Sequence, residues 1–130
     1  MPEAPPAPDD WRDAPLSPGE WTIAGATASF GPAGQPAFAI RCEGAGRIGI
    51  ARRASAASAT ALTLRTSTGV RSLPARSEGG ALVATLAASD PFLDAMVFSR
   101  GRFTVEAAGL PPLILPAWPE PARVLEDCRP

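Results

Sequence analysis

Cys42 and Cys128 are the only cysteines of this 130-residue chain, and they constrain its fold more than any other residues. Their separation does not match the spacing of metal ligands, and the chain contains no His that would complete a zinc site or activate a thiolate. An even number of cysteines in a small chain is typical of a disulfide. Such a bond would close a loop of about 86 residues and, in the chain-entropy model, stabilise the fold by about 4.6 kcal/mol. We therefore predict a Cys42–Cys128 disulfide and an oxidising compartment.

The composition predicts one small domain with a thin core. Apolar residues make up 45% of the chain, but many of them are Ala, which buries little surface. Large side chains that fill an interior are therefore few. We expect eight aromatic residues to anchor the core: Trp11, Trp21, Phe30, Phe38, Phe92, Phe98, Phe103 and Trp118.

Alternation of apolar and polar residues predicts antiparallel strands over most of the chain. In residues 37–42, for example, Phe38, Ile40 and Cys42 fall on one face and Arg41 on the other. Residues 81–86 are apolar without a clear period, so they form either a strand or the entry to a helix. The other predicted strands span residues 21–30, 47–50, 60–67, 70–75, 102–106 and 113–115, the last confined by Pro to a sheet edge or a late start.

Two helices are predicted from their N-terminal signals. Asp90 before Pro91 indicates the start of a helix that runs to about residue 98, and Pro119 starts another that reaches Cys128. The expected inward positions are Phe92, Ala95 and Met96 in the first helix, and Trp118, Ala122, Leu125 and Cys128 in the second. The chain is thus predicted to be mainly β, an antiparallel β-sandwich with one short internal helix and a C-terminal helix tied to the strand of Cys42.

Residues 1–19 are acidic, rich in Pro and without periodicity, so we expect an extended N-terminal arm before a single β-sandwich domain at 20–130. Trp11 in this arm is a candidate docking residue. The Pro-rich start is typical of a mature exported protein whose signal peptide has been removed. Since no apolar run reaches the roughly 20 residues of a membrane span, a periplasmic or secreted location is expected.

Basic residues are concentrated in the middle of the chain. Residues 41–102 hold nine Arg against four acidic residues, whereas residues 1–20 hold one Arg against five. Arg41, Arg47, Arg53 and Arg65 occupy outward positions of strands expected to be neighbours. If three of them converge, their guanidinium groups would bind a carboxylate or phosphate of cell-wall or lipid material. The alternative is a solvated strand surface that keeps the sheet edges soluble.

The residue types argue against an enzyme. Without His or Lys, the chain has no Ser–His or Ser–Lys base for acyl transfer. Asp90 and Asp94 are spaced as a carboxylate pair on one helix face, which leaves a carboxylate-based hydrolase as an alternative. The simpler interpretation is that Asp90 favours the helix dipole and Asp94 pairs with an Arg. We expect no catalytic residue, cofactor, metal site or nucleic-acid partner.

Residues 11–129 resemble an uncharacterised family of exported alphaproteobacterial proteins. The resemblance rests on the segments LTLRT (62–66), DPFLDA (90–95), FSRGRF (98–103), PAWPE (116–120) and EDCR (126–129). The layout, with a Cys in an early strand and a terminal helix ending in Cys, is also similar to that of the invasion-associated locus B proteins and of small accessory proteins of type VI secretion loci. Both resemblances imply a secreted β-sandwich, and neither implies an activity.

Two hypotheses of function follow. In the first, the protein is a non-catalytic module of the cell envelope whose edge strand or acidic arm docks a second protein. In the second, it binds an anionic envelope component through the Arg-rich strand face.

Overall fold

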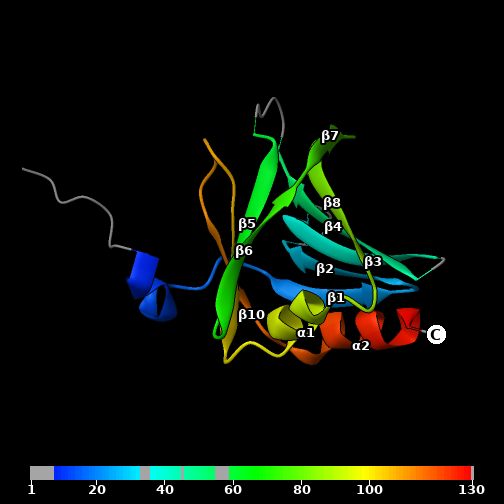
Figure 1. The fold of residues 1–130 in the computed structure, drawn as a ribbon. Coiled ribbons are helices and arrows are strands. Elements are labelled where there is room, and N and C mark those ends of the chain that lie inside the picture. Colours follow the sequence, from blue (N-terminus) through cyan, green and yellow to red (C-terminus); the bar gives the residue numbers. More distant parts are fainter. Residues whose placement is uncertain (1–7, 33–35, 45, 55–58, 130) are drawn as a thin grey trace, which may run out of the picture.

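The computed structural model describes residues 8–32, 36–44, 46–54 and 59–129 (Figure 1). It contains two antiparallel sheets and two α-helices, which confirms the predicted mainly β fold with an internal and a C-terminal helix. The first sheet has the order β1 (Glu20–Ala24), β2 (Thr27–Gly31), β3 (Phe38–Gly44), β4 (Arg47–Arg53), β8 (Ala81–Ala87) and β7 (Arg76–Glu78). The second has the order β10 (Leu113–Pro116), β9 (Arg102–Glu106), β5 (Ala61–Thr66) and β6 (Gly69–Pro74). The helices are α1 (Pro91–Val97) and α2 (Pro119–Cys128), and a 3-10 helix, η1 (Pro8–Asp13), precedes them.

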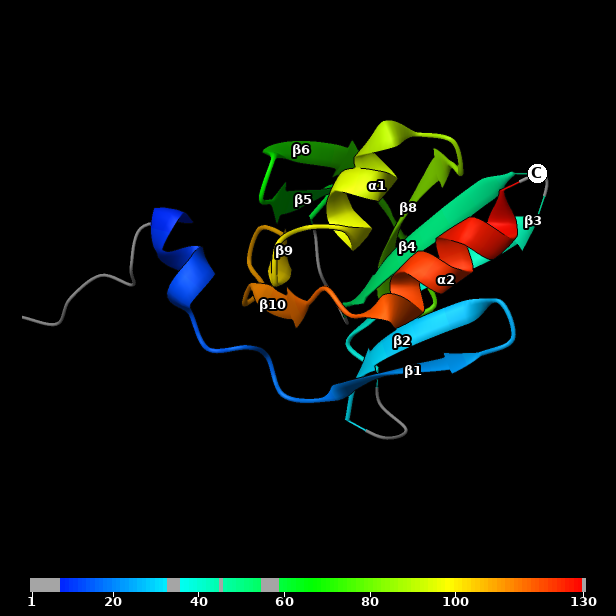
Figure 2. The same cartoon turned by 90° about the horizontal axis from the view of Figure 1, so that it is seen from below.

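The second sheet and the two helices together cover one face of the first sheet. Helix α2 packs against β1, β2, β3 and β4, and α1 packs between α2 and β5 (Figures 1 and 2). The second sheet contacts the first through β5 and β8. One continuous core therefore lies between the first sheet on one side and the second sheet with both helices on the other.

An aromatic cluster holds the centre of this core. The ring of Trp21 lies edge-on to Phe30 and Phe38, with centroids 5.5 and 6.1 Å away, and Phe103 from the second sheet completes the cluster. The indole N–H of Trp21 donates a 2.7 Å hydrogen bond to the carbonyl of Pro116. Because Trp21 stands on β1 and Pro116 on β10, this single side chain joins the two sheets through both apolar contact and a satisfied polar group.

Several strands differ from the prediction. The expected strand over 21–30 is a hairpin of β1 and β2, with Gly25 at a φ of 59° in its two-residue turn. The sequence gives little sign of this turn because no charged residue or Pro accompanies the Gly. Strand β7 was not predicted, and residues 81–86 belong to a strand, β8. Residues 33–35, 45 and 55–58 and the start of the arm, residues 1–7, lie outside the described residues.

The helices begin where predicted, and the predicted inward residues Met96, Leu125 and Cys128 are buried, but Trp118 is not. The Asp90 carboxylate caps α1 by accepting the N–H of Phe92 at 2.9 Å, and Pro91 follows it. In α2, however, Trp118 is the N-cap residue with an extended backbone, so its side chain lies outside the helical period and is 41% exposed. Phe98 likewise follows the last residue of α1 and is 62% exposed. The side chains that α1 and α2 bury are Leu93, Met96, Val97, Pro121, Val124, Leu125 and Cys128.

The described part of the N-terminal arm contacts the domain instead of extending from it. The backbone N–H of Ser17 donates to the carbonyl of Ile114, and the Ile114 N–H donates to the Ser17 hydroxyl, both at 2.9 Å. The Arg102 guanidinium donates to the Ala14 carbonyl. The arm therefore covers the free edge of β10, and Trp11 on η1 is itself buried.

Candidate functional site

The four outward Arg residues do not form one cluster. Arg41, Arg47 and Arg53 lie on the first sheet, but Arg65 lies on β5 in the second sheet. The expectation that their strands are neighbours is therefore wrong for Arg65. Its Nε donates at 2.9 Å to Glu106 across the pair β5–β9, and this carboxylate neutralises the charge locally.

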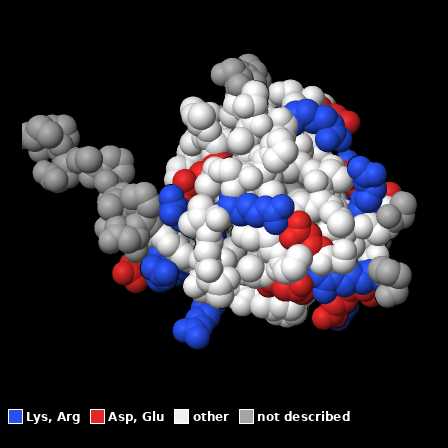
Figure 3. Space-filling view, in the orientation of Figure 1, with Lys and Arg blue, Asp and Glu red and all other residues white. Residues whose placement is uncertain are grey.

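Of the three remaining Arg residues, Arg41 and Arg47 are diagonal neighbours on the outer face of β3 and β4, and Arg53 lies apart from both. Arg41 is opposite Gly49 in the register, and Arg53 is four residues further along β4, which corresponds to about 13 Å. Arg41 pairs with Glu43 at 3.2 Å. Arg53 donates through Nε to the carbonyl of Pro36 and lies at the rim of a shallow hollow floored by Ala39 and Ala51. On the face seen in Figure 3, the basic side chains are likewise divided into separate groups.

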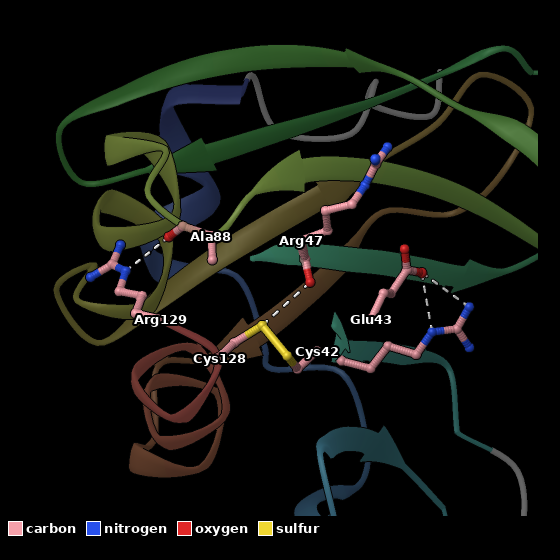
Figure 4. The surroundings of a disulfide bond; sticks show 7 residues. Cys42, Glu43, Arg47, Ala88, Cys128 and Arg129 are labelled. Atoms are coloured by element: carbon pink, nitrogen blue, oxygen red, sulfur yellow. Dashed lines mark hydrogen bonds and ion pairs between the residues drawn. A yellow bond between two sulfur atoms is a disulfide. The ribbon is translucent and has the colours of Figure 1, made fainter. Parts of the chain in front are cut away.

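The cysteines join the last turn of α2 to β3. Their sulfurs are 2.12 Å apart, the distance of a disulfide bond, and their Cα atoms are 5.4 Å apart (Figure 4). Cys128 is buried, and its sulfur also lies 3.3 Å from the carbonyl oxygen of Arg47 on the neighbouring strand. The bond therefore closes an 86-residue separation at the point where α2 meets the sheet.

An ion pair beside the disulfide joins the two helices. Arg129 donates to both oxygens of Asp94 at 3.0 and 2.9 Å, and its Nε donates to the carbonyl of Ala88 at 2.8 Å. The hydrogen bonds to Asp94 raise the pKa of Arg129 above its ordinary value. This bidentate geometry fixes the C-terminal end of α2 against α1.

Each member of the Asp90–Asp94 pair is held by a different Arg. The Asp90 carboxylate caps α1 and also accepts from Arg71 on β6 at 3.0 Å. The Phe92 N–H, followed by Arg71, holds the pKa of Asp90 below its ordinary value. Asp94 pairs with Arg129, so both carboxylates have the structural partners that the simpler interpretation expected.

Three exposed residues lie just after α1 and just before α2, and we refer to them together as the aromatic surface: Phe98, Arg100 and Trp118. The backbone N–H of Ala117, next to Trp118, donates to the carbonyl of Gly101 at 3.0 Å, which brings the end of α1 to the start of α2. Sequence reasoning placed both aromatic side chains in the core. Their positions just outside the two helix ends were the signal that could have shown otherwise.

Side-chain hydrogen bonds hold the loop of the aromatic surface in place. The Ser99 hydroxyl donates to the Arg102 carbonyl at 2.6 Å and accepts the N–H of Ser67 at 2.9 Å. The Arg100 N–H donates to the Ser67 hydroxyl at 3.0 Å. The hairpin β5–β6 therefore supports the loop, so the exposed side chains stand on a preorganised backbone.

Arg52 is a buried residue that the sequence analysis did not single out. It lies on β4 between Phe38 and Leu82 in the register and is only 6% exposed. Its terminal nitrogens donate to the carbonyls of Arg53 and Pro111, while the buried Nε has no partner. The alternation that turns Ile48 and Ile50 inward, continued by two residues, is the signal that identifies it.

The described residues contain no group of three or more His, Cys, Asp or Glu residues that could hold a metal ion. Within the same ranges, no helix has the length and hydropathy of a membrane span. The chain matches no family model, no curated protein and no solved structure. The resemblance to exported alphaproteobacterial proteins therefore stays a prediction from the residues.

Proposed function

We propose that this protein is an exported, non-catalytic interaction module of the cell envelope that docks a second protein through the aromatic surface. The observation that carries the proposal is the exposure of Phe98 and Trp118 in a chain with few large apolar residues. Such side chains would contribute more to stability inside the core, where burial of an aromatic ring is worth roughly 2–3 kcal/mol. The free protein forgoes this stabilisation, and a partner that buries the two rings recovers it on binding.

The chemistry of the aromatic surface fits a protein partner. Trp and Arg are the residue types that most often carry the binding energy of protein interfaces, and Phe is enriched in their centres. Arg100 has no acidic partner among the described residues, so its guanidinium is available to a carboxylate. We therefore expect a partner with an apolar pocket bordered by acidic side chains.

Export is supported by the disulfide. A bond of this kind persists in an oxidising compartment such as the periplasm or the extracellular space. The resemblance to exported proteins supports the same location. A folded, disulfide-bonded domain is consistent with docking in the cell envelope.

The alternative, an anion-binding face built from Arg41, Arg47, Arg53 and Arg65, has less support. Arg41 and Arg65 already pair with Glu43 and Glu106. A ligand carboxylate or phosphate would have to displace those side chains before it gained any charge compensation.

The proposal is tested by affinity capture from an envelope fraction under non-reducing conditions, with the wild-type chain and the double variant Phe98→Ser/Trp118→Ser. We expect one partner whose recovery falls at least about tenfold in the double variant, and whose direct binding, measured by calorimetry after purification, falls in parallel. Ile23→Ser is the matched control, because Ile23 is an exposed apolar residue on β1 outside the aromatic surface. Urea unfolding of each variant checks that the fold is retained.

Equal recovery of the partner by the double variant, or an equal loss in Ile23→Ser, would contradict docking through the aromatic surface. Recovery of lipid or glycan in place of a protein would favour the anion-binding alternative.

A further inference from the structure

Arg52 differs from every other Arg that the structure describes in detail. Five of the Arg residues form ion pairs with carboxylates, and all of those pairs lie at least partly in solvent. Arg52 is almost fully buried, and among the described residues no carboxylate pairs with it. Within the described part of the chain, its hydrogen-bond acceptors are the two main-chain carbonyls of Arg53 and Pro111, each at 2.5 Å.

This arrangement leaves a positive charge without compensation. Taking an ion out of water costs several kcal/mol even after relaxation, and neutral carbonyl dipoles offset only part of that cost. The unmatched Nε adds a buried donor that forms no hydrogen bond. Burial accordingly lowers the pKa of Arg52 from its ordinary value.

The surroundings of Arg52 form one end of the sandwich, which we call the loop end. The connections β6–β7 and β9–β10 lie there, in the upper part of Figure 1. The N–H of Ala54 at the end of β4 donates to the carbonyl of Gly80 at 2.9 Å, and the N–H of Ala75 donates to the carbonyl of Thr60 at 2.8 Å. The residues that line this end and pack on the core are apolar and only partly buried: Ala59, Ala75, Ala107, Leu110 and Leu113.

A guanidinium group without a counter-charge, surrounded by partly buried apolar residues, matches one class of ligand. We propose that the loop end binds an anionic amphiphile, with its carboxylate or phosphate head on Arg52 and its acyl tail against Leu110 and Leu113. A head-group oxygen replaces the carbonyl of Pro111 as acceptor, so that a hydrogen bond from the guanidinium to a neutral oxygen becomes one to a charged oxygen. The remaining head-group oxygen accepts the unmatched Nε, because a guanidinium fork binds such groups bidentately.

The site is independent of the aromatic surface. Phe98 follows α1 and Trp118 precedes α2, near the open end of the β9–β10 hairpin. Arg52 donates to Pro111 in the connection that closes the same hairpin at its other end. Failure of protein docking would leave this site unaffected, and failure of amphiphile binding would leave the docking proposal unaffected.

The test is calorimetry on the complete oxidised chain with decanoate and decyl phosphate, each below the concentration at which it forms micelles, and with 1-decanol below its solubility limit. We expect one or both anions to bind, and the neutral alcohol to bind at least about tenfold more weakly. The tighter of the two anions identifies the head group. Acetate and inorganic phosphate are included to measure the contribution of the head group alone. We expect acetate to bind at least about tenfold more weakly than decanoate, and inorganic phosphate at least about tenfold more weakly than decyl phosphate.

Arg52→Met is expected to weaken anion binding at least about tenfold, and Arg53→Met is the matched control. Arg53 is the next residue on the same strand but lies on the outer, exposed face. Absence of anion binding overturns the proposal, as does binding that is equal in Arg52→Met, equal for 1-decanol, or equal for acetate and phosphate.

A second measurement covers the case in which Arg52→Met does not fold. The Nε–H resonance of Arg52, assigned by through-bond NMR in the wild-type chain, is expected to shift when decanoate or decyl phosphate is added, because the buried Nε gains an acceptor. Saturation of the chain with either anion without a shift of this resonance would overturn the proposal.

Discussion

The two ends of the core hold an Arg side chain in opposite ways. At the helix end, defined by Cys42, Cys128 and Ala88 with α1 and α2, Arg129 meets a carboxylate with both arms of its fork, and a disulfide lies next to the pair. At the loop end, Arg52 is more deeply buried and meets only carbonyl groups. The contacts at the helix end stabilise the fold. At the loop end, the desolvated guanidinium of Arg52 costs free energy that a purely structural residue would not cost, and for this reason we assign a ligand to it.

The disulfide is expected to give the largest stability difference between the two ends. The double variant Cys42→Ser/Cys128→Ser should lower the free energy of unfolding by about 4.6 kcal/mol, because the unfolded chain loses its covalent loop. Equilibrium urea unfolding measures this, with reduced wild-type chain as the control. A loss below about 1 kcal/mol would mean that packing alone fixes the helix end.

Arg129→Leu should lower the free energy of unfolding by about 1.5 kcal/mol, since it removes a partly exposed ion pair and a hydrogen bond to the Ala88 carbonyl. Asp94→Asn is the partner variant, and a double-mutant cycle isolates the coupling between the two side chains. Additive effects would show that the bidentate pair contributes nothing.

Asp90→Ala should cost about 1 kcal/mol at neutral pH through loss of the cap of α1. Because the folded-state pKa of Asp90 lies below its unfolded value, the ionised cap stabilises the fold above a pH of about 4, and this contribution is lost as the pH falls through the folded-state pKa. The difference between wild type and variant should therefore shrink at acidic pH. In urea unfolding across this range, a difference that stays constant would contradict the assignment, and Asp90→Asn separates capping from charge.

At the loop end, Arg52→Met should change the free energy of unfolding of the ligand-free chain by less than about 1 kcal/mol. The variant loses two hydrogen bonds but also the cost of a desolvated charge. Urea unfolding beside Arg129→Leu tests the contrast directly. A loss of several kcal/mol from Arg52→Met would make Arg52 a structural bridge between the sheets and remove the difference between the ends.

Local patterns predicted much of the fold. Alternation placed Ile40, Leu62 and Val105 inside, and each is fully buried in the structure. Asp90 with Pro91 located the start of α1 because capping depends on neighbouring residues only. The same kind of reasoning failed at Phe98 and Trp118, because residues just beyond a helix end do not follow its period.

By itself, the sequence determined which side chains of a strand share a face, where the helices begin and which two thiols were able to pair. These features depend on the period of the backbone, on adjacent residues or on a count of two cysteines. Only the tertiary structure decided that β5 joins β9 and not β4, which separates Arg65 from Arg41, Arg47 and Arg53. It also brought Pro111 to Arg52, and Ser67 to the loop of Phe98. Strand order and contacts between sheets arise from the packing of residues far apart in the chain, and no local period records them.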